Sequence, residues 1–326
     1  MTKYDVYAEN VCKTYHARWK IGLDKKEKDQ QPAKIALNNV SLFVEPGETI
    51  GVIGLNGSGK STLVKILCGI IKADHGEVEC LGYNPFYQRR KYVKNIGVVF
   101  GQKTLLYMDL PLRDSLELYR VVYDMTRDEF QREIALLDKY FGINEIMDQP
   151  VRKLSFGQRV RGDLAASVLH NPRLLILDEP SIGLDILASD NLSQYINQRS
   201  QEGKATILVS HNVDLLSSSC SHVVVLENGI KRVDRTVEWL KLQALVDVEF
   251  AYTNVRDPKA MDELFEKTNC KERGTSHAVL SVNSDSVDGV VDLLEKSCSL
   301  VHLNVKPPDV RDMMSSLIVG GNSQSG

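Results

Sequence analysis

The chain has 326 residues, of which 43% are hydrophobic and 25% are charged, and its formal net charge is −3. These values are typical of globular proteins, so they exclude a disordered chain, a collagen-like chain and a fibrous coiled coil. Proteins that bind nucleic acid through its phosphates usually carry a basic surplus, so the charge balance argues against a nucleic-acid partner. No stretch approaches the roughly 20 consecutive apolar residues that a membrane-spanning helix needs.

Along the chain, segments rich in β-branched and aromatic residues predict short strands over residues 4–15 and within 36–53. The segment between them, residues 16–34, is polar and charge-dense and is expected to be a loop. A helix is expected over 61–70, and two more within 113–147, where apolar residues recur at helical spacing. Three continuous apolar runs indicate strands buried on both faces, at 174–177, 205–210 and 223–226.

Strands that alternate with helices in this way predict an α/β fold, in which helices cover a parallel sheet. The pattern changes near residue 235, and two strand–helix pairs between 245 and 316 predict a small α+β module. The last residues are rich in Gly, Ser and Asn and are expected to fray. We therefore expect three parts: a domain at 1–235, a C-terminal extension at 236–316 and a tail at 317–326.

Residues 54–61, GLNGSGKS, match the phosphate-loop pattern GxxxxGK[ST] between an expected strand and an expected helix. Glycines let successive backbone N–H groups point at phosphate oxygens, and the start of the helix adds partial positive charge. Lys60 is expected to reach the β- and γ-phosphates, and the Ser61 hydroxyl to coordinate Mg²⁺. The loop therefore predicts a site for a nucleoside triphosphate.

Two adjacent acids, Asp178 and Glu179, follow the apolar run at 174–177. A buried strand of a parallel sheet would bring both to the carboxyl edge of the sheet, where ligands bind in open α/β folds. Asp178 is expected to hold the Mg²⁺ shell, and Glu179 to polarise a water that attacks the γ-phosphate. An isolated Asp-Glu pair could equally begin a helix, but a phosphate loop upstream favours the catalytic interpretation.

Three further segments occur in an informative order. Residues 154–158, LSFGQ, precede the acidic strand by about 20 residues, Gln102 follows an apolar strand at 96–100, and His211 follows the run at 205–210. With these segments, residues 1 to about 235 resemble the nucleotide-binding subunit of an ABC transporter. The resemblance implies a P-loop NTPase fold, with a RecA-like core, an antiparallel β subdomain and a helical subdomain at about 103–165.

The resemblance also implies roles for single residues. Tyr15 would stack on adenine, Gln102 would touch Mg²⁺ and the attacking water, and His211 would contact the γ-phosphate. Residues 154–158 match the signature segment, which caps the γ-phosphate bound to the opposite subunit, and residues 181–185 match the D-loop. The expected catalytic residues are Glu179, His211 and Gln102. The expected Mg²⁺ ligands are Ser61, Gln102 and Asp178. The expected nucleotide-binding residues are Tyr15, Gly54, Asn56, Gly57, Ser58, Gly59, Lys60, Ser61, Thr62, Ser155, Gly157, Gln158 and Asp185.

The signature segment departs from the usual family pattern, LSGGQ, because Phe156 replaces the first glycine. The N–H of residue 156 stays available if its backbone suits a residue with a side chain, whereas a positive φ would strain it. Ser155 and Gly157 are retained, so we expect activity to survive.

Phosphoryl transfer needs charge neutralisation on all sides of the γ-phosphate, and one subunit supplies it on one side only. We therefore expect a second ATP-binding subunit, the same or different, and ATP and Mg²⁺ as cofactors. The segment at 103–111 and the extension resemble a subgroup that works with ABC-2-type exporters, such as the daunorubicin-resistance type. The extension is expected to stabilise dimers or regulate rather than bind substrate.

Six scattered cysteines without metal-type spacing, and an N-terminus without an apolar leader, favour the cytoplasm. The protein is expected to be peripheral on the cytoplasmic face of the membrane, bound to an ABC-2-type permease. The leading hypothesis is thus an ATPase that powers export. The alternative is a soluble ABC ATPase without transport, in translation, DNA repair or regulation. Translation factors of that kind carry two cassettes per chain, and chromosome and repair ATPases contain a long coiled coil, for which no heptad run is present.

Overall fold

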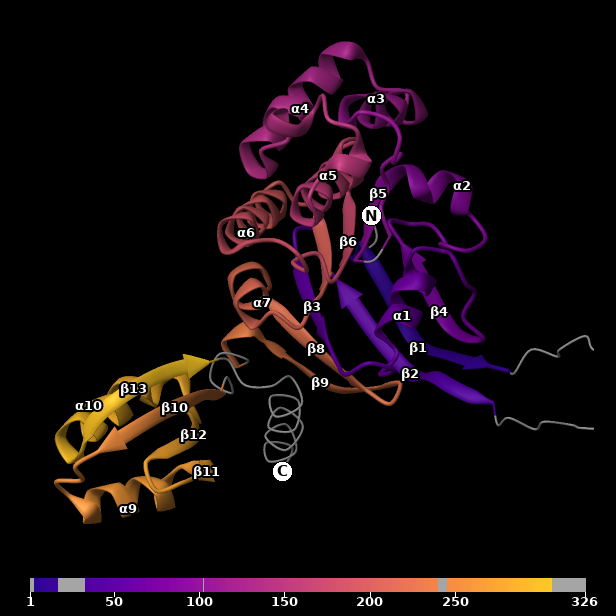
Figure 1. Ribbon diagram of the computed structural model, residues 1–326. Helices are drawn as coiled ribbons and strands as arrows, with labels where there is room; N and C mark the ends of the chain where they lie inside the picture. Colours follow the sequence, from indigo (N-terminus) through magenta and orange to yellow (C-terminus); the bar gives the residue numbers. More distant parts are fainter. Residues whose placement is uncertain (1–2, 17–32, 102, 240–244, 307–326) are drawn as a thin grey trace, which may run out of the picture. The chain divides into compact units, whose positions relative to one another are not determined.

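The computed structural model describes residues 3–16, 33–101, 103–239 and 245–306. It divides the chain into two compact units, Met1–Asp234 and Arg235–Gly326 (Figure 1). Most of the loop expected at 16–34, and the tail expected at 317–326, lie outside the described residues. None of the helices formed by the described residues combines the length and the apolar content that a bilayer span requires.

A sheet of six strands forms the centre of the first unit, in the order β5-β6-β7-β3-β8-β9. Its strands are β3 (Thr49–Ile53), β5 (Ile96–Phe100), β6 (Leu174–Asp178), β7 (Ala205–Val209), β8 (His222–Glu227) and β9 (Ile230–Thr236). The pairs that join β5 to β6, β6 to β7, β7 to β3 and β3 to β8 are all parallel. The parallel sheet predicted from the apolar runs is therefore confirmed.

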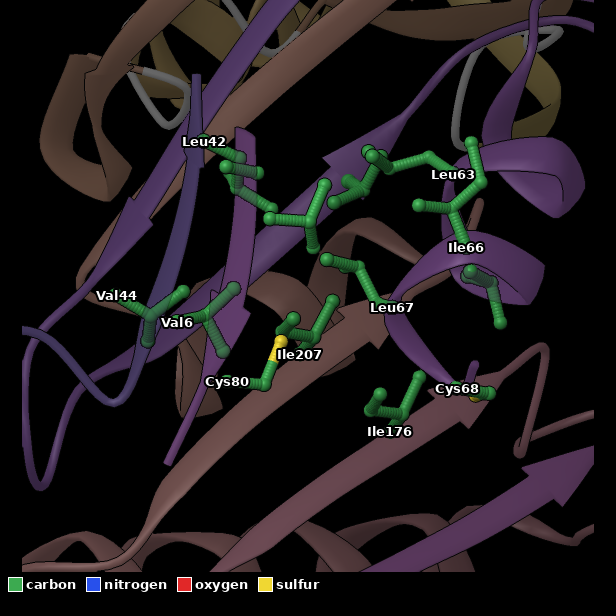
Figure 2. Packing of buried hydrophobic residues seen from close by; sticks show 14 of the residues in the cluster. Val6, Leu42, Val44, Leu63, Ile66, Leu67, Cys68, Cys80, Ile176 and Ile207 are labelled. Atoms are coloured by element: carbon green, nitrogen blue, oxygen red, sulfur yellow. The ribbon is translucent and has the colours of Figure 1, made fainter. Parts of the chain in front are cut away.

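A second, antiparallel sheet has the order β2-β1-β4, with β1 (Val6–Tyr15), β2 (Lys34–Val44) and β4 (His75–Cys80). β4 was not expected, because only Val78 and Cys80 of its six residues are buried beside β1. The two sheets enclose one hydrophobic cluster (Figure 2). In it, Val6 and Leu42 from the antiparallel sheet and Ile176 and Ile207 from the parallel sheet pack around helix α1 (Lys60–Leu67).

Helix α1 is shorter than the expected 61–70. It ends at Leu67 because the chain turns at Gly69, whose φ of 65° lies in the left-handed region that favours glycine. On the opposite face of the parallel sheet, Leu216 lies against Gly51. The remaining helices of this unit are α2 (Arg89–Tyr92), α3 (Leu112–Val122), α4 (Arg127–Phe141), α5 (Phe156–Val168), α6 (Ile186–Gln201) and α7 (Val213–Ser219), with 3₁₀ turns at Val93–Asn95, Asn144–Ile146 and Val151–Lys153.

The two helices expected within 113–147 are confirmed, and the break between them has a local cause. Asp124 has a φ of 55°, and Thr126 caps α4 through a reciprocal pair of hydrogen bonds with Glu129. α5 contacts both α3 and α4, and it also packs against β5. It therefore joins the helical segment that follows residue 103 to the parallel sheet.

The second unit is an α+β module with its own core around Phe250 and Leu280. Its sheet has the order β11-β12-β10-β13. The elements are β10 (Leu245–Thr253), α9 (Pro258–Lys267), β11 (Asn269–Arg273), β12 (His277–Asn283), a 3₁₀ turn (Ser284–Ser286), α10 (Val287–Ser297) and β13 (Ser299–Lys306). The expected strand–helix pairs are present, and β11 is an additional polar edge strand.

Candidate functional site

Adjacent parallel strands bring the predicted site residues to one edge of the central sheet. Val52 of β3 pairs with Val209 of β7, and Val209 pairs with Asp178 of β6. Because parallel strands end at the same edge, the phosphate loop that follows β3, the acids at the end of β6 and His211 after β7 come together there. Phe100 of β5 pairs with Asp178 as well. Gln102, two residues further on, lies outside the described residues.

The phosphate loop leads from β3 into α1 and leaves the start of that helix open. Gly59 precedes the first helical residue with a φ of 109°, and a Cβ at this position would lie 2.6 Å from the Ala36 carbonyl oxygen. Only glycine satisfies both constraints. No side chain caps α1, so the N–H groups of Lys60 and Ser61 remain available for an anion, whereas the Thr62 N–H donates to the Gly59 carbonyl. The hydroxyl of Ser58 is buried in the loop without a hydrogen-bond partner.

The ammonium of Lys60 lies inside this loop and is 93% buried as a residue. Its Nζ donates hydrogen bonds to the carbonyl oxygens of Gly54 and Leu55. Burial lowers the pKa of Lys60 from its ordinary value, whereas the charges of Glu179 and Asp178 act in the opposite direction. The loop therefore holds a positive charge ready for a phosphate group, and two carboxylates favour its charged form.

Glu179 and His211 form the centre of the strand-end cluster. The N–H of Glu179 donates to the Val209 carbonyl over 2.8 Å, and this bond holds Glu179 in the left-handed region at a φ of 55°. His211 Nε2 lies 3.3 Å from Glu179 Oε1, so the imidazole and the carboxylate are neighbours. Such strained backbone at a non-glycine residue is typical of functional sites. The turn aims the carboxylate away from the sheet and toward His211.

Burial shifts the titration of each group in this cluster. It raises the pKa of Glu179, a backbone hydrogen bond at His211 and the Lys60 charge oppose this rise, and the neighbouring Asp178 charge adds to it. Burial also raises the pKa of Asp178, against the influence of Lys60, and it lowers the pKa of His211. His211 is thus neutral at neutral pH. A carboxylate with a raised pKa is the better proton acceptor for water that a base needs to be.

A cavity of about 180 Å³ lies over the phosphate loop. Tyr15, at the end of β1, borders it together with the predicted loop residues from Asn56 to Thr62. The structure therefore brings the predicted adenine-stacking residue and the phosphate loop to one cavity. Lys34 and Ala36 line it too, although no motif in the sequence pointed to them. Lys34 arrives there because it pairs with Tyr15 across the antiparallel sheet.

The predicted residues of the signature segment and the D-loop do not line this cavity. Ser155 caps α5, and its Oγ accepts a hydrogen bond from the N–H of Gln158, whose side chain bonds back to the N–H of Ser155. Asp185 caps α6 by accepting from the N–H of Ala188 over 2.8 Å. Phe156 is the first residue of α5. Its backbone is helical, so the phenylalanine that replaces the family's glycine does not need a positive φ and is not strained.

These residues fit a magnesium nucleotide. The partnerless hydroxyl of Ser58 and the uncapped helix provide donors where phosphates would bind. Ser61 and Asp178 offer the hydroxyl and carboxylate oxygens that Mg²⁺ prefers. Within the described ranges no cluster of three or more His, Cys, Asp or Glu residues could hold a metal by itself. This is the usual arrangement for Mg²⁺, which takes its remaining ligands from phosphates and water.

Comparisons with known proteins agree with this chemistry. The family described as "ABC transporter" matches residues 37–182. The ABC transporter ATP-binding protein NatA of Bacillus subtilis is 29% identical over 63% of this chain and 83% of its own length. The linearmycin resistance ATP-binding protein LnrL of the same organism is 28% identical, over 60% and 63%. A putative ABC transporter ATP-binding protein of Listeria monocytogenes is 30% identical, over 61% and 75%.

Solved structures show the same fold. A dimeric structure of the ATP-binding cassette MJ0796, described as a post-hydrolysis state bound to ADP and Pi, superposes with a TM-score of 0.61. The match is 24% identical and covers 71% of this chain and 98% of that one. The predicted P-loop NTPase fold is therefore confirmed.

The raised pKa of Glu179 predicts the acid side of the pH–rate profile. If the Glu179 carboxylate accepts the proton of water, hydrolysis at saturating Mg–ATP declines as pH falls through a midpoint above 4.5, the ordinary value for Glu. Neutral His211 adds no decline near 6.5, because its pKa is lowered. ATP hydrolysis measured between about pH 4.5 and 8 checks this, with nucleotide binding followed over the same range as the control. A rate that stays flat down to 4.5 would contradict it.

Proposed function

The chain belongs to the family of ABC transporter ATP-binding proteins, and we propose that it powers export through a separate membrane permease of the ABC-2 type. As a member of that family it binds ATP and hydrolyses it. The convergence of Lys60, Asp178, Glu179 and His211 beside the phosphate loop is the observation that carries the hydrolytic assignment. It joins a cationic phosphate site to a base with a raised pKa on one sheet edge.

In the proposed reaction, first-turn N–H groups of α1 and Lys60 hold the β- and γ-phosphates. Ser61 and Asp178 would hold Mg²⁺, which would neutralise charge on the phosphate oxygens, and Gln102 is proposed to contact the Mg²⁺ and the attacking water. Glu179 takes a proton from the attacking water as the water oxygen bonds to the γ-phosphorus and the bond to the leaving oxygen breaks. His211 lies beside Glu179 and is proposed to donate a hydrogen bond to the γ-phosphate.

The reaction needs a second ATP-binding subunit. Ser155 and the N–H groups of Phe156 and Gly157 are proposed to bind an anion at the start of α5, and they do not border the cavity over the phosphate loop of their own subunit. We propose that this signature segment, with Asp185 of the D-loop, covers the nucleotide of the opposing subunit. ATP then closes the dimer, and hydrolysis reopens it by adding charge repulsion between products.

Export through an ABC-2-type permease is supported by the similarity to NatA and to LnrL, the linearmycin resistance protein. In this proposal the protein is peripheral on the cytoplasmic face of the membrane, where the permease converts dimer closure into alternating access. The C-terminal extension is proposed to stabilise the dimer or to regulate it. The alternative of a soluble ABC ATPase without transport is not favoured, because these relatives are ATP-binding proteins of transporters or of drug resistance.

Glu179→Gln tests the base. The amide keeps the size of the side chain but cannot accept the proton, so ATP hydrolysis should fall by about 10²- to 10⁴-fold while ATP still binds. Because the closed state can no longer decay, ATP-bound dimers should accumulate in size-exclusion chromatography. Asp190→Asn, an exposed acid on α6, is the matched control and should leave hydrolysis unchanged. Undiminished turnover in Glu179→Gln would refute the assignment.

Ser155→Arg tests the role in the opposing subunit. The long cation fills the anion site at the start of α5, so turnover should fall by about 10²-fold or more. Binding of ATP to a single subunit should stay within twofold of the natural protein, because Ser155 lies outside the cavity over the phosphate loop. Equilibrium binding with a fluorescent ATP analogue at low protein concentration measures this. Loss of single-subunit binding would show that Ser155 acts within its own site.

Co-expression with candidate permeases tests export. A suitable candidate is a neighbouring gene product with about six apolar segments of about 20 residues each. The chain should then sediment with membranes, co-purify with the permease and hydrolyse ATP faster than it does alone. The chain expressed without the permease is the control. ATP hydrolysis by a chain that binds none of these membrane proteins would favour the soluble alternative.

A further inference from the structure

Phe156 makes a contact that a glycine at its position could not make. A Cβ placed on Gly183 would lie 2.2 Å from both Cδ1 and Cε1 of Phe156, so the ring rests directly on the Gly183 Cα. Gly183 has a φ of 86°, which favours glycine for the backbone as well. The two positions are therefore complementary. The Phe156 ring fills the space that a side chain at position 183 would occupy.

The next residue strengthens the same junction. A Cβ on Gly157 would lie 2.7 Å from the Gly183 carbonyl oxygen, so the backbones of α5 and the D-loop approach closely. The Arg159 guanidinium carbon lies 5.7 Å from the centre of the Phe156 ring, within the range of a cation–π interaction. The first turn of α5 therefore contacts Gly183 through the Phe156 ring and through the close backbone approach at Gly157.

Asp185, the last residue of the D-loop, caps α6, but residues 181–184 have few other hydrogen bonds among the described residues. The internal backbone bonds of the D-loop include a 3.4 Å contact from the Ile182 N–H to the Glu179 carbonyl and a 3.1 Å bond from Leu184 to Ser181. Phe156, Ile182 and Glu179 also border one cavity of about 180 Å³. The ring therefore lies where it can restrain the short segment that runs from Glu179 to Asp185.

We propose that Phe156 is a positioning residue that fixes the D-loop, residues 181–185, against the start of α5. The signature segment and the segment that follows Glu179 then keep one geometry as the opposing subunit docks. The inference rests on the proposed function, because the benefit arises when both segments meet the nucleotide of the opposing subunit. Phe156 is 47% exposed as a residue, and the neighbouring Ser155 is exposed as well.

Phe156→Ala tests this proposal, because alanine removes the ring and keeps the helix. Hydrolysis should show a kcat about fivefold lower, equivalent to about 1 kcal/mol, with KM for ATP within twofold. Amide hydrogen exchange over residues 181–185 should accelerate, and exchange over 54–61 should not change. Phe156→Tyr retains the ring and should restore both values. Phe86→Ala, an exposed aromatic away from the site, should change neither.

The outcomes separate the inference from the proposed function. An unchanged kcat with unchanged exchange over 181–185 in Phe156→Ala overturns the positioning role. So does a raised KM with an unchanged kcat, because that result would mean that Phe156 only helps nucleotide to bind. If the natural protein hydrolyses no ATP, the proposed function fails instead. The exchange measured on the nucleotide-free protein then still decides whether Phe156 holds the D-loop.

Discussion

The site depends on the interactions that hold the buried ammonium of Lys60. It would be costly to hold inside the protein without partners, and the Gly54 and Leu55 carbonyls and the charges of Asp178 and Glu179 compensate for the loss of water. The same contacts set the curve of the phosphate loop and tie it electrostatically to the end of β6. Substrate phosphate would meet a positive charge that is already positioned, so little reorganisation is needed.

The parallel sheet makes this arrangement possible but completes only one side of it. Strands β3, β7 and β6 present the phosphate loop, His211 and the two acids at one edge. The signature segment begins α5, which belongs to the helical part, and its residues do not border the cavity over the phosphate loop. If the signature segment completes the site of an opposing subunit, as we propose, chemistry would be coupled to assembly, because neither subunit would neutralise the γ-phosphate alone.

The sequence predicted those parts whose signal is local. The run at 174–178 is apolar at every buried position, and the phosphate loop has a fixed spacing, so both could be recognised without a structure. Features that depend on pairing between segments far apart in the sequence could not be predicted. β4 is mostly exposed and contains Gly76, and Lys34 borders the cavity only because it pairs with Tyr15. The contact between Phe156 and Gly183 joins positions 27 apart, for which no periodic pattern exists.

The uncapped start of α1 has a consequence for the whole unit. A helix whose first N–H groups lack partners is less stable than a capped one, and a bound triphosphate would supply the missing acceptors. Any ligand that binds only the native state raises the free energy of unfolding by RT ln(1 + [L]/Kd). The resistance of this unit to proteolysis should therefore rise with the concentration of the nucleotide that occupies the phosphate loop.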